Sequence, residues 1–108
     1  MSVKIVNMTY KHGLSDAHSK LYHETKKMVQ DEVFRVLQKN VSHVMGVKLV
    51  SFRNTTGHVV ASLIIVMNKT GVELFNVTKQ ELYDAMRNGT FRSFDIDKYF
   101  DFDIKCKL

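Results

Sequence analysis

The chain has 108 residues, of which 44% are hydrophobic and 25% are charged, and its formal net charge is +5. A chain of this length holds one core, so we expect residues 1–108 to form a single domain. The composition is that of a folded globular protein and excludes a disordered chain. No apolar run reaches the roughly 18 residues of a transmembrane helix, so we expect no direct membrane insertion.

The positive charge is dispersed, since Lys26 and Lys27 are the only adjacent pair among 16 lysines and arginines. A nucleic-acid-binding domain concentrates basic residues in a patch or stripe, so no nucleic-acid partner is expected. The five histidines form no ligand motif, and the acids between Asp95 and Asp103 lack the glycine and closing glutamate of a calcium loop. We therefore expect no metal, no cofactor and no enzymatic activity.

The first predicted element is a strand from Val3 to Tyr10, where side chains alternate between two faces. Asn7 shares a face with Val3 and Ile5, and its exposure would require that side of the sheet to be open to solvent. A long helix follows, with Ser15 and Ser19 as candidate N-caps and an end near residues 38–40. Its apolar stripe comprises Leu21, Thr25, Met28, Val29, Val33, Val36 and Leu37.

Two β-rich runs come next, Val44–Arg53 and His58–Met67, and the turn residues Asn54–Gly57 between them predict a hairpin. The second run is apolar on both faces, as a central strand is. The sequence Thr78-Lys79-Gln80-Glu81 is typical of a capping box and predicts a short second helix. Its buried residues are expected to be Leu82, Ala85 and Met86.

This second helix should end at Asn88, with Gly89 in the left-handed conformation. Alternating apolar and charged residues predict a last strand over Asp95–Lys105. The order is then β-α-β-β-α-β. We expect an α+β, ferredoxin-like sandwich in which two helices cover one face of a four-stranded antiparallel sheet. An RNA-recognition domain shares this order, but the third strand lacks the aromatic residues that stack on bases.

Every asparagine of the chain begins an N-x-[ST] acceptor triplet for N-glycosylation. Serine and threonine total 14 residues, so six matches out of six have a chance of about five in a million. Five of the six fall at predicted turns or element ends, where a bulky glycan fits. The sequence thus predicts an extracellular glycoprotein whose glycans are carried by Asn7, Asn40, Asn54, Asn68, Asn76 and Asn88.

Three stretches resemble the SEA domain, a βαββαβ module of membrane mucins, proteoglycans, adhesion receptors and membrane-anchored serine proteases. Ser19-Lys20-Leu21-Tyr22 is similar to the family's Ser/Thr-x-x-Tyr helix start, and Val33-Phe34 to its later hydrophobic-Phe pair. Phe52-Arg53 precedes the hairpin as in the family's Phe-Arg-x-Gly-Ser-Val-Val-Val. Gly57-His58-Val59-Val60 stands where the family has Gly-Ser-Val-Val. The likeness runs from Val3 to Ile104.

The resemblance implies a site of self-cleavage, since many SEA domains cut themselves between that Gly and Ser. The serine hydroxyl attacks the preceding carbonyl, and the resulting ester is hydrolysed. Here His58 replaces the serine, and we expect Asn54–Thr56 to lengthen the turn and relax its strain. The sequence therefore predicts an uncleaved domain, although Thr55 and Thr56 each carry a hydroxyl after a peptide bond.

We expect the chain to be a structural and interaction module of a larger membrane-anchored or matrix protein. The first residues run directly into the strand pattern at Val3, so we expect no signal peptide in this sequence, and Cys106, the single cysteine, could form a disulfide with another module. The expected partners are the attached glycans and the neighbouring extracellular modules of the same precursor. Two alternatives remain open: a self-cleaving or protease-sensitive shedding module, and a nucleic-acid-binding ferredoxin-like domain.

Overall fold

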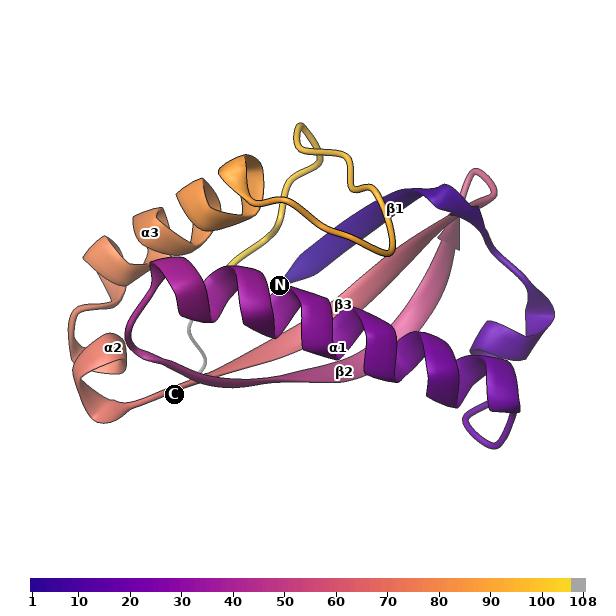
Figure 1. Ribbon diagram of the computed structural model, residues 1–108, viewed down its shortest axis with the longest axis horizontal. Coiled ribbons are helices and arrows are strands. Elements are labelled where there is room, and N and C mark those ends of the chain that lie inside the picture. The colour runs from indigo at the N-terminus through magenta and orange to yellow at the C-terminus, as the bar shows by residue number, and fades with distance from the viewer. Residues whose placement is uncertain (106–108) are drawn as a thin grey trace.

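The computed structural model describes residues 1–105, and Cys106, with its predicted disulfide, lies outside them. Figure 1 shows a sheet with a long helix crossing in front of its strands and a second helix beside it. The elements are β1 (Ser2–Thr9), the 3-10 turn η1 (His12–Ser15), α1 (Lys20–Asn40), β2 (Val44–Thr55), β3 (His58–Met67), α2 (Lys69–Glu73) and α3 (Phe75–Asn88).

The sheet has three antiparallel strands in the order β1-β3-β2. The central position predicted for the strand His58–Met67 is confirmed, since β3 pairs with both other strands. Its side chains Val59, Ala61 and Leu63 are at most 3% exposed and face the core. The predicted hairpin is confirmed as well, because β2 and β3 pair with each other up to Thr55 and His58.

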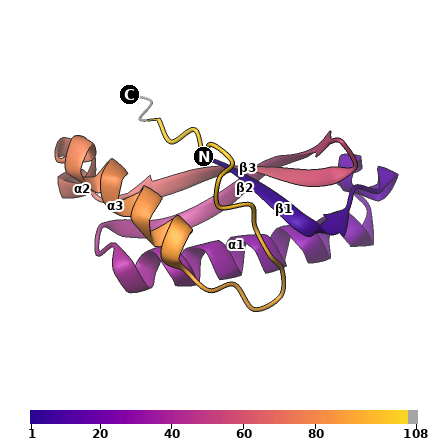
Figure 2. The same ribbon diagram turned by 90° about the horizontal axis from the view of Figure 1, so that it is seen from above.

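Helix α1 lies along one side of the sheet, and α3 descends toward it from the far end of β3 (Figure 2). Ser19 is the N-cap of α1, where its Oγ accepts a hydrogen bond of 3.0 Å from the Tyr22 N–H. Val29, Val33 and Leu37 of the predicted stripe are fully buried. The stripe is less apolar than predicted, because its buried face also includes the carboxylate of Glu32.

The fourth strand is not formed in the described part of the chain, and this prediction is wrong. The segment Phe94–Ile104 does run along the free edge of β1: the Val6 N–H donates to the Asp95 carbonyl (2.9 Å) and the Ser2 N–H to the Phe102 carbonyl (2.7 Å). Between these bonds the chain turns at Asp97, whose carboxylate accepts the Tyr99 N–H. This turn interrupts the pairing and leaves an isolated bridge from Ile5 to Ile96.

The predicted side-chain alternation of this segment holds at its end, where Phe102 and Ile104 are buried and Asp103 is exposed. The segment therefore packs as an edge strand would, without the regular backbone pairing of one. The fold is an α+β fold with a three-stranded antiparallel sheet and two main helices.

The second helix begins earlier than predicted, at Phe75 rather than after Thr78. The predicted capping box is wrong because Thr78 lies inside α3: its N–H donates to the Leu74 carbonyl at 2.9 Å, and its side chain is 1% exposed. A five-residue helix, α2, precedes α3 and begins at Asn68, whose Oδ1 accepts the Gly71 N–H at 2.9 Å. As predicted, Leu82, Ala85 and Met86 are buried.

Gly89 ends α3 in an extended conformation (φ −70°, ψ 152°), so the predicted left-handed cap is wrong. Glycine is required here because the neighbouring residues leave no room for a side chain. A Cβ atom at this position would lie 2.3 Å from Cγ1 of Val36 and 2.7 Å from the carbonyl oxygen of Ala85. The close approach lets the end of α3 rest against α1.

We predict that Gly89→Ala lowers the free energy of unfolding by about 1–3 kcal/mol, because the added methyl group overpacks the contact between α3 and Val36. Gly46→Ala is the matched control, since a Cβ there meets nothing within 4 Å. Its effect should stay within about 1 kcal/mol and can be stabilising. Urea denaturation of the unglycosylated protein measures both, and equal losses would contradict the steric explanation.

Candidate functional site

The hairpin tip is the region where the sequence places the degenerate cleavage motif. Thr55 pairs with His58, so the turn consists of two residues, Thr56 and Gly57, whose φ angles are 50° and 86°. Positive φ at both central residues is typical of the tight hairpin turns that match strand twist. The prediction of a longer, relaxed turn is therefore wrong, because Asn54 and Thr55 belong to β2.

Two hydrogen bonds fix the backbone of Gly57. Its N–H donates to Oδ1 of Asn54 at 2.8 Å, and its carbonyl accepts the Tyr10 N–H at 2.8 Å. The second bond joins the tip to the chain just after β1. It also places a donor on the carbonyl oxygen that would carry negative charge if the Gly57–His58 bond were attacked.

Thr56 is the strained residue of the turn, because a β-branched side chain rarely adopts positive φ. Its hydroxyl donates a 2.7 Å hydrogen bond to the Thr55 carbonyl oxygen. The hydroxyl is thus directed at the oxygen of the preceding carbonyl, whereas an acyl shift needs its lone pair to approach the carbonyl carbon. The observed geometry does not favour cleavage between Thr55 and Thr56.

His58 is half-buried at the start of β3, and Val59 and Val60 behind it are fully buried. The motif Gly57–Val60 therefore runs from the exposed turn directly into the core. An imidazole on residue 58 offers no hydroxyl or thiol for attack on the Gly57 carbonyl, although the backbone bonds around this carbonyl are in place.

The six acceptor asparagines lie on the surface: five are exposed, and Asn68 is half-buried. Three of them use their amide oxygen as an acceptor, which leaves Nδ2, the atom that carries a glycan, outside these bonds. These are Asn7 with the Asp95 N–H (2.9 Å), Asn54 with Gly57, and Asn68 with Gly71. Asn40 differs, since its Nδ2 donates to the Val36 carbonyl at 2.9 Å.

Asn7 is exposed because the pairing of β1 is irregular. Val3 and Ile5 face the core, but the register with β3 shifts between Ile5 and Thr9. A β-bulge of this kind ends the simple two-residue alternation and turns the next side chains to other faces. The sequence pattern could not show this shift.

The acceptor triplets cluster toward the ends of the elements. Asn54 lies at the hairpin tip, Asn40 and Asn88 are the last residues of α1 and α3, and Asn68 is the N-cap of α2. Asn76 lies in the first turn of α3, and Thr78, the threonine of the same acceptor triplet, is buried. Asn7 is the exception and lies within β1, whereas the middle of α1 carries no acceptor asparagine.

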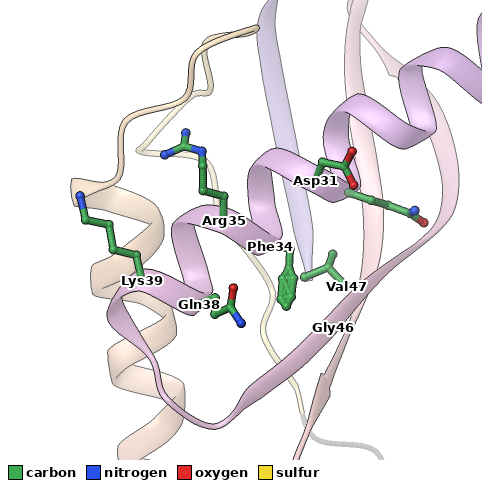
Figure 3. Close-up of a pocket in the computed structure, with 8 residues that line it drawn as sticks. Asp31, Phe34, Arg35, Gln38, Lys39, Gly46 and Val47 are labelled. Atoms are coloured by element: carbon green, nitrogen blue, oxygen red, sulfur yellow. The ribbon is translucent and has the colours of Figure 1, made fainter.

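A groove between α1 and the beginning of β2 was not predicted from the sequence. Figure 3 shows Phe34 and Gln38 on the side of α1 that faces Gly46 and Val47. Gln30 completes this row, and its Oε1 accepts the Leu49 N–H at 2.7 Å. The spacing of four between Gln30, Phe34 and Gln38 was the available signal, since it places them on one helix face.

Within residues 1–105, no three histidine, cysteine or acidic side chains lie close enough together to hold a metal ion. Asp97 and Asp101 use a carboxylate oxygen to accept the backbone N–H two residues further on, at 2.9 Å each. These acids thus shape the irregular segment beside β1.

We predict that Thr56→Asn raises the free energy of unfolding by about 0.5–1 kcal/mol, because asparagine tolerates the left-handed conformation of this turn. Thr55→Asn is the matched control and should not stabilise, since Thr55 is an extended strand residue. The measurement is urea denaturation of protein produced in bacteria. Thr56→Asn removes the acceptor triplet of Asn54, but this protein carries no N-glycan, so the comparison is unaffected. No gain in Thr56→Asn would mean that the turn is unstrained.

Comparison with known families identifies the chain. The family profile of the SEA domain matches residues 1–97, which contain every named strand and helix. A search of curated proteins gives no match. SEA domains are typically extracellular modules of larger proteins and are generally non-catalytic. None of the helices within residues 1–105 has the length and apolar character needed to cross a membrane. The resemblance seen in the sequence is therefore confirmed, and the chain belongs to the SEA domain family.

Proposed function

We propose that the chain is an extracellular, N-glycosylated SEA module that serves structure and interaction in a larger membrane-anchored or matrix protein. The observation that carries this proposal is the set of six acceptor triplets, all with their asparagine at an exposed or half-buried position. A cytosolic protein has no use for such a set. The module acts without enzymatic chemistry and without cofactors, and glycans and neighbouring modules are its partners.

The structural roles of the asparagines determine how the glycans must be tested. Asn54 and Asn68 satisfy backbone N–H groups, so their replacement removes a hydrogen bond together with the glycan. Replacing the Ser or Thr two positions later removes the acceptor triplet and leaves the asparagine in place. Thr9, Ser42, Thr70 and Thr90 are exposed and suit this approach, whereas the buried Thr78 does not.

We predict that protein secreted from mammalian cells loses mass when treated with an endoglycosidase that removes N-glycans. Thr70→Ala should remove one glycan and leave stability nearly unchanged. Asn68→Gln should remove the same glycan and also cost about 1 kcal/mol, because α2 loses its N-cap. Mass spectrometry of secreted protein and urea denaturation of unglycosylated protein separate the two effects. A secreted protein without any glycan would refute the proposal.

We further propose that the module stays intact because the hairpin tip lacks a nucleophile. The tight turn and the Tyr10 N–H on the Gly57 carbonyl support a backbone suited to cleavage. What is missing is the hydroxyl that His58 replaces. In the reaction it would supply, the hydroxyl oxygen bonds to the Gly57 carbonyl carbon, the peptide C–N bond breaks to free the amine of residue 58, and water hydrolyses the ester.

We predict that the natural chain runs as one band on a denaturing gel and that His58→Ser yields two fragments, residues 1–57 and 58–108. His58→Ala is the control and should remain intact, since it also removes the imidazole but supplies no hydroxyl. Mass spectrometry of the fragments locates the cut. Fragments from the natural chain would overturn the proposal, and an intact His58→Ser would show that the turn geometry, and not the nucleophile, prevents cleavage.

A further inference from the structure

The two edges of the sheet differ in how their backbone groups are used. The edge of β1 is covered by the segment Phe94–Ile104, which bonds to Ser2, Lys4 and Val6. Strand β2 pairs with β3 on one side only, and residues 45–55 make no other backbone–backbone hydrogen bond among the described residues. An unpaired strand edge presents N–H and C=O groups that can pair with another chain.

One side-chain contact shows which backbone N–H and C=O groups of β2 point toward the unpaired edge. The Leu49 N–H donates to Oε1 of Gln30, so this N–H points away from β3 and toward α1. In an antiparallel ladder the N–H and C=O of one residue share a side, and the pattern repeats every second residue. The N–H and C=O of Val47 therefore lie on the same open edge as those of Leu49.

Two bulges delimit this stretch of edge. The register between β2 and β3 shifts between Val44 and Gly46 and again between Leu49 and Ser51. The extra residues Met45 and Val50 are exposed, and a bulge disrupts regular pairing. The regular open edge is therefore short and runs from Gly46 to Leu49.

The groove lies along this stretch, with Gln30, Phe34 and Gln38 of α1 on its other side (Figure 3). Phe34 is half-buried and offers an apolar surface between two carboxamides. Gln30 already places an amide oxygen on the Leu49 N–H, which is the position that a peptide carbonyl of an added strand would take. None of the six acceptor asparagines lines the groove, and Asn40, which follows the lining residue Lys39, lies at its end.

We propose that this groove binds an extended peptide segment of another protein, which adds as a strand to β2 at Gly46–Leu49. Its backbone pairs with Val47 and Leu49, and an apolar side chain of the segment rests on Phe34. Asp31 lines the groove together with Arg35 and Lys39, and Arg35 is paired with Glu32, so the groove itself has no clear excess of positive charge. The segment is neutral or acidic because the chain as a whole carries a net charge of +5. This charge disfavours a second copy as the occupant, since two copies repel each other.

The proposal rests on the interaction role given to the module above, and it names the class of partner. The probe is a phage-displayed library of random dodecapeptides, selected on the secreted, glycosylated chain. We expect the enriched peptides to lack lysine and arginine and to share apolar residues at alternate positions. Synthetic copies of these peptides are then titrated against three variants by fluorescence anisotropy.

The variants predict changes of opposite sign. Val47→Pro should weaken binding at least tenfold, because it removes a free N–H from the edge while the ladder to β3 remains. Gln30→Ala should tighten binding about fivefold, because the peptide no longer competes with the internal amide for the Leu49 N–H. Ile64→Lys is the control on the exposed, helix-free face of the sheet and should leave binding unchanged. Circular dichroism verifies that each variant folds. If Val47→Pro does not fold, the tighter binding expected for Gln30→Ala decides the test.

Three results would overturn the proposal. The first is a selection that enriches no peptide. The second is binding that Ile64→Lys removes and Gln30→Ala leaves unchanged, since the peptides would then occupy the sheet face. The third is a dimer in analytical ultracentrifugation that Val47→Pro dissociates, since the edge would then serve a second copy. The glycan and cleavage experiments are independent of all three, so failure here does not bear on glycosylation or intactness.

Discussion

The buried carboxylate of Glu32 is the contact on which the C-terminal part of the fold depends. Its oxygens accept the backbone N–H groups of Arg92 and Ser93, and it lies 3.8 Å from the guanidinium of Arg35. Arg35 in turn donates to the Thr90 carbonyl at 2.7 Å. A buried carboxylate is stable only with such partners, so the loop after α3 is held on α1. From there Phe94 enters the core and the chain reaches the edge of β1. One sheet edge is closed as a result, and the other remains open.

The sequence was sufficient to predict β1, α1, the hairpin and the central position of β3, because hydrophobic periodicity determines these elements locally. It failed where tertiary contacts decide. The start of α3 depends on Leu74 and not on Thr78, and Gly89 is required by Val36, a residue far away in the chain. Glu32 could have been recognised, since it falls between Val29 and Val33 on the apolar stripe, but a charged residue is normally assigned to the solvated side.

The candidate sites were predictable to different degrees. Acceptor triplets can be read from the sequence, but the bonds of Asn7 and Asn40 cannot, since they depend on a bulge and on a helix end. The turn residues Asn54–Gly57 led us to expect a longer turn, but the turn consists of Thr56 and Gly57 alone. The register between β2 and β3 decides where the strands end, and the sequence does not show it. The groove was missed because it arises from an unpaired strand and a helix that are packed together only in the folded chain.

The antiparallel course of the C-terminal segment along β1 has a mechanical consequence. Ser2 lies opposite Phe102, and Lys4 and Val6 lie opposite Asp97 and Asp95, so the two ends of the described chain leave the sheet at neighbouring points. Tension pulling these ends apart would load the bonds between Met1 and Leu63 and the bond between Ser2 and Phe102 first, and the bonds at Lys4 and Val6 afterwards. Bonds that open in succession resist far less force than bonds loaded together. The hairpin tip lies at the opposite end of β1, beyond Thr9, and would feel the load last.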